Sequence, residues 1–146
     1  MITQFNKWKL HDLLPLPSWV HQSGKVTLLG DSCHAALPYL GQGAAGAFED
    51  AACLGRMLRT SPSILTALYS FQQIRKPRST VIQVKSRMHQ EILHVEDGAF
   101  QVERDQKMAK DGEENPLFWG SLERRKWLFD YDAEVASNIE NLSFIV

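Results

Sequence analysis

The sequence predicts a mostly helical protein that carries one short strand of a sheet but not the strands that would flank it. Apolar residues recur at three- and four-residue spacing through most of residues 44–95, which is typical of helices. Only residues 25–29 combine β-branched and apolar side chains in a short run bounded by glycines. The 146 residues contain no internal repeat or linker, and 44% hydrophobic with 23% charged residues is ordinary for a globular protein. We therefore expect a single unit.

The strand is predicted for residues 25–29, Lys-Val-Thr-Leu-Leu, between Gly24 and Gly30. The run is too short for a stable helix and is mostly apolar, so we expect a buried strand. A buried strand needs neighbours that satisfy its backbone hydrogen-bonding groups, and no second run in the sequence has a comparable pattern. The sheet partners of this strand are therefore expected to lie outside this chain.

The first long helix is predicted to begin near Ala44, after a loop over residues 30–43. Its regularly spaced apolar positions are Ala44, Ala47, Phe48, Ala51, Leu54, Gly55 and Leu58. Because most of these side chains are small, the helix backbone can approach a sheet or a ligand closely. We expect exposed apolar surface on this face and beside residues 25–29, since the parts that would cover them are absent.

A second helix is predicted from the neighbourhood of Ser63, with Ser61 as its N-cap and Pro62 in its first turn. Its first apolar positions are Ile64, Leu65, Leu68 and Phe71. Pro77 is expected to kink or interrupt the helix, because a proline inside a helix removes one backbone hydrogen bond.

Beyond Pro77 the helical pattern is predicted to continue until Asp97-Gly98 stops it. The expected apolar stripe consists of Val81, Val84, Met88, Ile92 and Val95. A shorter charged helix is predicted over about residues 99–110, ending by Gly112, and a last short helix is expected to start at Asp132.

Composition excludes several classes of protein. Sixteen basic and seventeen acidic residues give a net charge of −1, which lacks the basic excess of a nucleic-acid-binding protein. No run of apolar residues is long enough to span a membrane, and Lys7, Lys9 and Asp12 interrupt any signal peptide. Cys33 and Cys53 are too few for a disulfide framework and lie among small apolar residues, so we expect buried free thiols in the reducing cytoplasm.

Residues 41–46, Gly-Gln-Gly-Ala-Ala-Gly, match the dinucleotide-binding pattern G-x-G-x-x-G. In that fingerprint the first glycine follows a strand directly, and an acidic residue ends the next strand about 20 residues later. Here the predicted strand ends at Leu29, and residues 61–66 contain no acidic side chain, so the pyrophosphate role fails on context. Two interpretations stay open: the helix N-terminus holds an anionic or electron-rich group, or the glycines serve close packing alone.

Two other chemistries receive little support from the sequence. Ser32 follows the predicted strand like the nucleophile of a hydrolase, with His34 as a possible base. However, His34 stands where that motif requires glycine, and side chains two residues apart rarely form such a hydrogen bond, so a cap or turn serine is favoured. His89 and His94 are five residues apart on a predicted helix and therefore do not share one face, so no metal site is expected.

Taken together, the run from Gly30 to Ala51, GDSCHAALPYLGQGAAGAFEDA, resembles the second flavin-binding motif of single-component FAD-dependent aromatic hydroxylases. The fungal salicylate-hydroxylase-like flavin monooxygenases are the most similar group. The pattern is Gly-Asp, a His three residues later, a Pro four residues after that, Gly-Gln-Gly, and a small-residue helix with Glu-Asp-Ala. Similarity continues around Pro77 and over residues 127–133, so the resemblance covers about residues 7–135.

This resemblance implies a fragment of an α/β FAD-binding fold of the glutathione-reductase-like, aromatic-hydroxylase type. Asp31 would accept hydrogen bonds from the ribityl hydroxyls of FAD, and Pro38 would lie beside the ring edge where oxygen reacts. The first N–H groups of the helix would face the N1 and C2 carbonyl side of the isoalloxazine. The implied FAD-binding residues are Asp31, Pro38, Gly41, Gln42, Gly43, Ala44 and Ala45. No catalytic side chain and no metal ligand is implied, and the role of His34 stays open.

The activity implied by the resemblance is hydroxylation of a salicylate-like aromatic substrate by molecular oxygen. NADH or NADPH would reduce the flavin, and a flavin C4a-hydroperoxide would transfer the hydroxyl group. The N-terminal dinucleotide-binding half of such an enzyme has no counterpart here, so residues 1–146 are expected to be the C-terminal portion of one FAD-binding monooxygenase domain and not self-sufficient. The alternatives are a non-catalytic helical remnant or interaction module without flavin and, more remotely, a serine hydrolase using Ser32.

Overall fold

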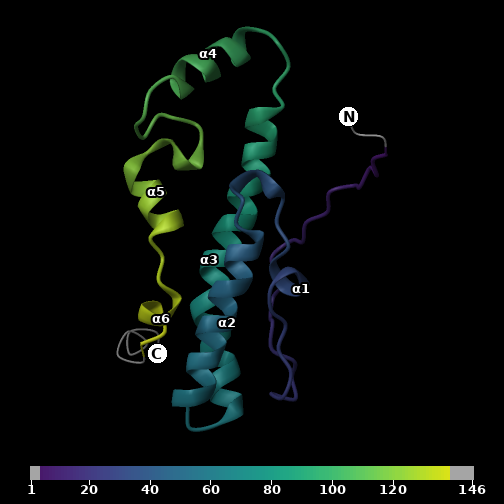
Figure 1. Ribbon diagram of the computed structural model, residues 1–146, viewed down its shortest axis with the longest axis vertical. Helices are drawn as coiled ribbons and strands as arrows, with labels where there is room; N and C mark the ends of the chain where they lie inside the picture. The colour runs from purple at the N-terminus through teal and green to yellow at the C-terminus, as the bar shows by residue number, and fades with distance from the viewer. Residues whose placement is uncertain (1–3, 139–146) are drawn as a thin grey trace.

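A computed structural model describes residues 4–138 of the chain (Figure 1). The helical elements are α1 Asp31–His34, η1 Pro38–Leu40, α2 Gly43–Thr60, α3 Ile64–Leu93, α4 Ala99–Met108, η2 Phe118–Gly120, α5 Leu122–Phe129 and α6 Ala133–Ala136. No strand forms within the described range. The prediction of a mostly helical chain is therefore confirmed at the level of secondary structure.

The predicted strand over residues 25–29 is wrong. Residues 20–27 instead form a tight reversal with one isolated antiparallel bridge, between Val20 and Thr27. Val26 and Leu29 are 57% and 42% exposed, so the run is not buried either. Its composition suits a strand, but the described residues supply no sheet with which it could pair.

Helices α2 and α3 lie side by side and run in opposite directions, forming the centre of the molecule (Figure 1). Helix α2 begins at Gly43, one residue before its predicted start. The buried face of α2 is formed by Gly46, Asp50, Cys53 and Met57. On the opposite face Phe48 is 77% exposed and Leu58 is also exposed, which confirms the expected uncovered apolar surface.

The start of α3 differs from the prediction. Ser63, not Ser61, is the N-cap, and its side chain accepts a hydrogen bond from the Thr66 N–H. Ser61 instead ends α2, with its N–H donating to the Met57 carbonyl. Pro62 consequently lies in the connection before the cap rather than in the first helical turn.

Pro77 does not interrupt α3, which is continuous from Ile64 to Leu93. Arg75 and Arg78 stand on either side of Pro77 and form ion pairs with α2, so tertiary contacts hold this stretch helical despite the missing backbone bond. The helix ends at Leu93, with His94 as its C-cap, before the predicted stop at residues 97–98.

The apolar stripe predicted beyond Pro77 is also wrong, because Val81, Val84 and Met88 are exposed. The buried face there is formed by Ile82, Gln83, Ser86 and His89. Gln83 donates hydrogen bonds to the Leu13 and Ala35 carbonyls and thereby holds the extended N-terminal segment. Gln83 and His89 on this face therefore bind the backbone of neighbouring segments.

The C-terminal part returns along α3 through α4, α5 and α6 (Figure 1). The predicted charged helix over 99–110 is confirmed as α4, and the short helix after Asp132 is confirmed as α6. The Asp132 carboxylate caps α6 by accepting the N–H groups of Glu134 and Val135. Helix α5 was not expected from the sequence. Its N-cap is Ser121, whose side chain accepts from the Arg124 N–H.

Two small apolar clusters support this arrangement. The first contains Trp19, Cys33, Cys53, Met57, Ala67 and Phe71, and the second contains Leu40, Ile82, Phe118 and Leu128. Both cysteines are buried free thiols, as predicted. Among the described residues, no helix has the length and apolar character that crossing a membrane requires.

Candidate functional site

The N-terminus of α2 is the centre of the predicted site. Pro38 opens the 3-10 turn η1, and Gly41 ends it with a φ of 64°, a left-handed conformation that favours glycine. Gln42 then precedes the helix, but neither its side chain nor any other caps it. Within the described chain, the N–H groups of residues 43–45 have no hydrogen-bond acceptor, and the first turn carries no acidic residue.

Asp31 lies at the start of the one-turn helix α1, immediately after the tight Gly30, whose φ is 59°. It follows extended chain rather than the end of a strand, which corrects the sequence prediction. The Asp31 side chain is exposed, and no hydrogen bond or ion pair to it is found among residues 4–138. The turn packs on α2, since a Cβ built on Gly30 would lie 3.6 Å from the Ala47 Cβ.

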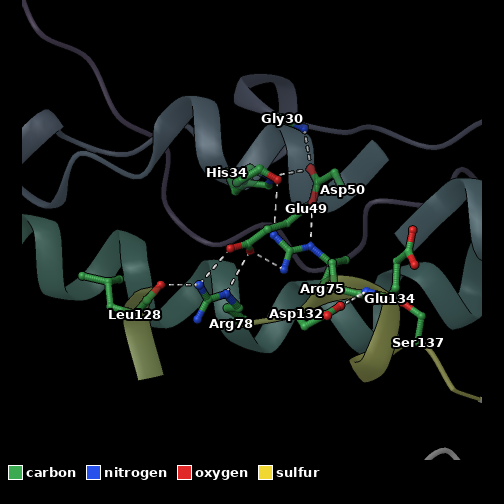
Figure 2. Close-up of polar contacts among 12 residues, drawn as sticks. Gly30, His34, Glu49, Asp50, Arg75, Arg78, Leu128, Asp132, Glu134 and Ser137 are labelled. Atoms are coloured by element: carbon green, nitrogen blue, oxygen red, sulfur yellow. Dashed lines mark hydrogen bonds and ion pairs between the residues drawn. The ribbon is translucent and has the colours of Figure 1, made fainter. Parts of the chain in front are cut away.

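A buried carboxylate lies beneath this surface (Figure 2). Asp50 is 0% exposed. Its Oδ2 accepts the Gly30 N–H at 2.8 Å and lies 2.6 Å from His34 Nε2, while its Oδ1 accepts Arg75 Nε–H at 2.8 Å. The Asp50 side chain of α2 therefore contacts Gly30, the helix α1 that follows Gly30, and α3.

Glu49 forms further ion pairs next to those of Asp50 (Figure 2). Glu49 accepts two hydrogen bonds from the Arg78 guanidinium, at 2.8 and 2.9 Å, and lies 2.7 Å from Arg75 Nη1. Arg78 also donates to the carbonyls of Trp127 and Leu128, and its guanidinium lies over the ring of Tyr131. These contacts hold the C-terminal segment against α2 and α3.

The electrostatics favour an ion-pair cluster over a metal site. Burial alone would raise the pKa of Asp50, but hydrogen bonds from His34, Gly30 and Arg75 outweigh it and hold that pKa below its ordinary value. Burial raises the pKa of the neighbouring Cys33 thiol to about 12. Ligand atoms of Cys33, His34 and Asp50 lie within 4.8 Å of one another, yet both oxygens of Asp50 are already engaged by Gly30, His34 and the Arg75 cation.

The hydrolase alternative does not fit the geometry. Ser32 Oγ donates to the Leu29 carbonyl at 2.7 Å, and His34 is buried and bonded to Asp50. In the described part of the chain no hydrogen bond joins Ser32 to His34. The serine is therefore a turn residue, and the histidine belongs to the buried cluster.

Comparison with known proteins decides the family. No protein-family model matches the chain. It is 40% identical over 133 residues to the FAD-dependent monooxygenase OpS4 of Beauveria bassiana, covering 87% of this chain and 31% of that protein. It is 40% identical over 96 residues to 3-hydroxybenzoate 6-hydroxylase 1 of Aquipseudomonas alcaligenes, covering 65% of this chain and 24% of that protein. The salicylate hydroxylase of Pseudomonas putida is 37% identical over 94 residues, which cover 62% of this chain and 21% of that protein.

The chain belongs to the FAD-dependent monooxygenase family. It spans at most 31% of the length of these three relatives. The similarity alone therefore does not assign the activity, substrates or partners of the longer proteins to this chain. What the described residues contribute is an uncapped N-terminus of α2, an exposed carboxylate at the start of α1 and a buried ion-pair cluster between α1, α2 and α3.

Sequence reasoning did not single out Asp50, and it assigned the arginines around Pro77 no specific contacts. The available signal was chemical complementarity: Glu49 and Asp50 are adjacent acidic residues in a small-residue helix, and Arg75 and Arg78 are three residues apart on the next helix. Two acidic and two basic groups at matching positions of an antiparallel helix pair are typical of buried salt bridges.

Proposed function

We propose that this chain is the C-terminal, flavin-binding portion of an FAD-dependent aromatic hydroxylase with a glutathione-reductase-like fold. The observation that carries the proposal is the N-terminus of α2, where three backbone N–H groups have no acceptor in the described structure. A helix N-terminus carries a partial positive charge and favours anionic or electron-rich groups. Pro38 and Asp31, to which the proposal also assigns flavin contacts, are both exposed.

The residues present suit a flavin. The N1 and C2 carbonyl side of the isoalloxazine is electron-rich and becomes negative on reduction, which matches free N–H groups better than a basic side chain. When bound, FAD would supply electron transfer from NADH or NADPH and the activation of oxygen. In the proposal, Gly43, Ala44 and Ala45 donate to the ring, and Asp31 accepts from the ribityl hydroxyls.

The turn before α2 would orient the ring. Pro38 and Gly41 fix the backbone of η1, the first through its ring and the second through its left-handed conformation. Leu40, between them, is buried in the second apolar cluster and anchors the turn to α3. The Gln42 side chain donates to the Leu40 carbonyl at 3.4 Å and leaves the helix N–H groups uncovered.

We further propose that an N-terminal dinucleotide-binding half covers the apolar outer face of α2 and residues 25–29. The size of the curated relatives and the exposure of Phe48 and Val26 support this proposal. In this arrangement the other half binds the adenosine end of FAD and completes the pocket for a salicylate-like aromatic substrate. The chain alone would then hold flavin weakly and would not hydroxylate, because nothing excludes water from the ring.

A titration of the purified chain with FAD, followed by flavin fluorescence, tests the proposal. We expect weak binding that Asp31→Asn weakens and that Gln42→Asp also weakens, because an acidic N-cap occupies the helix N–H groups and repels a negative ring. Gln42→Asp should at the same time stabilise the fold by about 0.5–1 kcal/mol, whereas the control Gln42→Ala adds no charge or cap and should weaken FAD binding less than Gln42→Asp does. Opposite effects on stability and binding are the expected signature.

Three results would count against the proposal. Absence of FAD binding at millimolar concentration would reject flavin binding by this chain. Binding that neither Asp31→Asn nor Gln42→Asp alters would place the flavin elsewhere. Stoichiometric yellow protein that hydroxylates salicylate with NADH or NADPH would show a self-sufficient enzyme and reject the need for a second half.

A further inference from the structure

We infer that Asp50 is a positioning residue: its buried carboxylate braces both ends of the one-turn helix α1 and so fixes the direction in which Asp31 points. This inference rests on the proposed function, in which Asp31 contacts the flavin. Asp50 itself is completely buried and cannot touch a ligand. It acts through the backbone that carries Asp31.

The brace is formed by a single oxygen atom. Asp50 Oδ2 accepts the N–H of Gly30, the N-cap of α1, and also contacts Nε2 of His34, the last residue of α1. Asp31 is the residue between these two attachments that begins the helix. Both ends of the turn are therefore fixed to the same point on α2, at 2.8 and 2.6 Å.

Helix α1 needs such a brace because it has little stability of its own. It is four residues long, has no side-chain cap, and starts from Gly30 in a left-handed conformation. Its internal bonds include only two that close on the Gly30 carbonyl, from Cys33 and His34. A single helical turn orders its residues for very few hydrogen bonds, so it is not stable without tertiary contacts.

Two further features of the cluster serve the brace. Arg75 binds the other carboxylate oxygen of Asp50 and also donates to the Gly46 carbonyl, which leaves Oδ2 aimed at α1 (Figure 2). Gly46 has no side chain, and a Cβ there would lie only 3.3 Å from His34 Cε1. The third glycine of the G-x-G-x-x-G match thus makes room for His34, whereas a Cβ at Gly41 or Gly43 would meet no atom within 4 Å.

The test compares Asp50→Asn with Glu49→Gln in the 146-residue chain. Both variants neutralise one carboxylate of the ion-pair group, but Glu49 makes no contact with α1 in the described structure. We expect both to lower thermal stability. Only Asp50→Asn should shift the Gly30 and Asp31 amide resonances in an NMR spectrum and remove the slow hydrogen exchange of the Gly30 N–H.

FAD titrations then show whether the brace acts through Asp31. Asp31→Asn and Asp50→Asn should each weaken FAD binding by about 3- to 10-fold, the range expected for one or two hydrogen bonds. The double variant should bind no more weakly than either single variant, because an unbraced Asp31 has already lost its contact. Glu49→Gln should leave FAD binding unchanged.

These outcomes separate the inference from the proposed function. If the wild-type chain binds no FAD, the proposed flavin site fails, and so does any role of Asp50 in aiming Asp31 at flavin, whatever the amide spectra show. If FAD binds but the two losses multiply in the double variant, or if Gly30 keeps its protection in Asp50→Asn, the positioning role is overturned. Should Asp50→Asn not fold, His34→Gln replaces it: this variant removes one arm of the brace but keeps the Asp50–Arg75 pair and the Gly30–Asp50 bond, so it is judged only by whether its loss of FAD binding multiplies with that of Asp31→Asn.

Discussion

Each face of α2 carries residues whose burial is the opposite of what their polarity alone would suggest. The inner face carries Asp50, which no solvent reaches, whereas the outer face presents Phe48 and Leu58 to solvent. This difference shows that hydrogen bonds to specific partners organise the fold of this chain on the inner face of α2. On the other side, apolar residues stay exposed, and in the proposed function an N-terminal half covers them.

Energetics explain how both faces coexist. A buried carboxylate costs several kcal/mol unless its oxygens are satisfied, and Asp50 is bound by Gly30, His34 and Arg75. The outer face forgoes roughly 25 cal/mol for each Å² of apolar surface that stays in water. A covering partner would recover that free energy, whereas the inner face has already obtained its stabilisation within the chain.

The largest expected effect comes from breaking the inner face. Arg75→Met should lower the free energy of unfolding by about 3–5 kcal/mol, because it leaves the Asp50 carboxylate buried without its cation. Urea denaturation followed by circular dichroism measures the loss. Arg59→Met, at an exposed position of α2, should change stability by no more than about 0.5 kcal/mol. A loss below about 1 kcal/mol in Arg75→Met would mean that the buried pair does not organise the fold.

A second test concerns another buried polar group, His89 on the covered side of α3. Its Nδ1–H donates to the Lys85 carbonyl, and its Nε2 accepts the Phe118 N–H, so the neutral ring is required. Burial lowers the pKa of His89 below 6.5, and the charges of Lys85 and Arg124 lower it further. The unfolded chain therefore takes up the proton first, and stability should fall as the pH drops below about 6.5.

The slope should approach about 1.4 kcal/mol per pH unit and flatten once the pH is below the pKa of His89 in the folded chain. His89→Gln should remove this component of the pH dependence between pH 5 and 7, measured by urea denaturation at each pH. His11→Gln removes an exposed histidine and serves as the control. Parallel pH curves for the wild type and His89→Gln would show that protonation of His89 does not weaken the folded state.

Local signals predicted the parts of the fold that depend on neighbouring residues. The glycines at 41 and 43 predict the start of α2, and Asp132 predicts the cap of α6, because both effects act within a few residues. The strand at residues 25–29 failed because strands depend on distant partners. The choice of Ser63 over Ser61 as a cap depends on where α2 ends, which the sequence of α3 does not contain.

The same distinction between local and long-range signals applies to the candidate site. The residues proposed to contact flavin lie in one contiguous motif and could be proposed from the sequence. Their contacts with flavin stay a prediction. The brace could not be predicted, since Asp50 is separated by 20 residues from Gly30, by 16 from His34 and by 25 from Arg75. No periodic pattern encodes contacts over such distances. Once α2 and α3 are paired, the complementary charges explain them.

The smallest and most closely matched test places the same substitution on both faces of α2. At Gly55 a Cβ would meet no atom within 4 Å, so Gly55→Ala should stabilise the chain by about 0.5–1 kcal/mol through helix propensity. At Gly46 the Cβ would press on the His34 ring, which Asp50 holds in place. Overpacking of about 1–3 kcal/mol should exceed the propensity gain, so Gly46→Ala should be neutral or destabilising.

Urea denaturation of the two variants measures the difference, which should be roughly 1–3 kcal/mol in favour of Gly55→Ala. Equal stabilisation by both would show that His34 yields freely and that the inner face is not tightly packed. Gly55→Ala has a second use, because a methyl group on the outer face would obstruct a partner that approaches the backbone closely. A variant that is more stable alone yet associates more weakly with an N-terminal flavoprotein half would identify the outer face as the surface where that half docks.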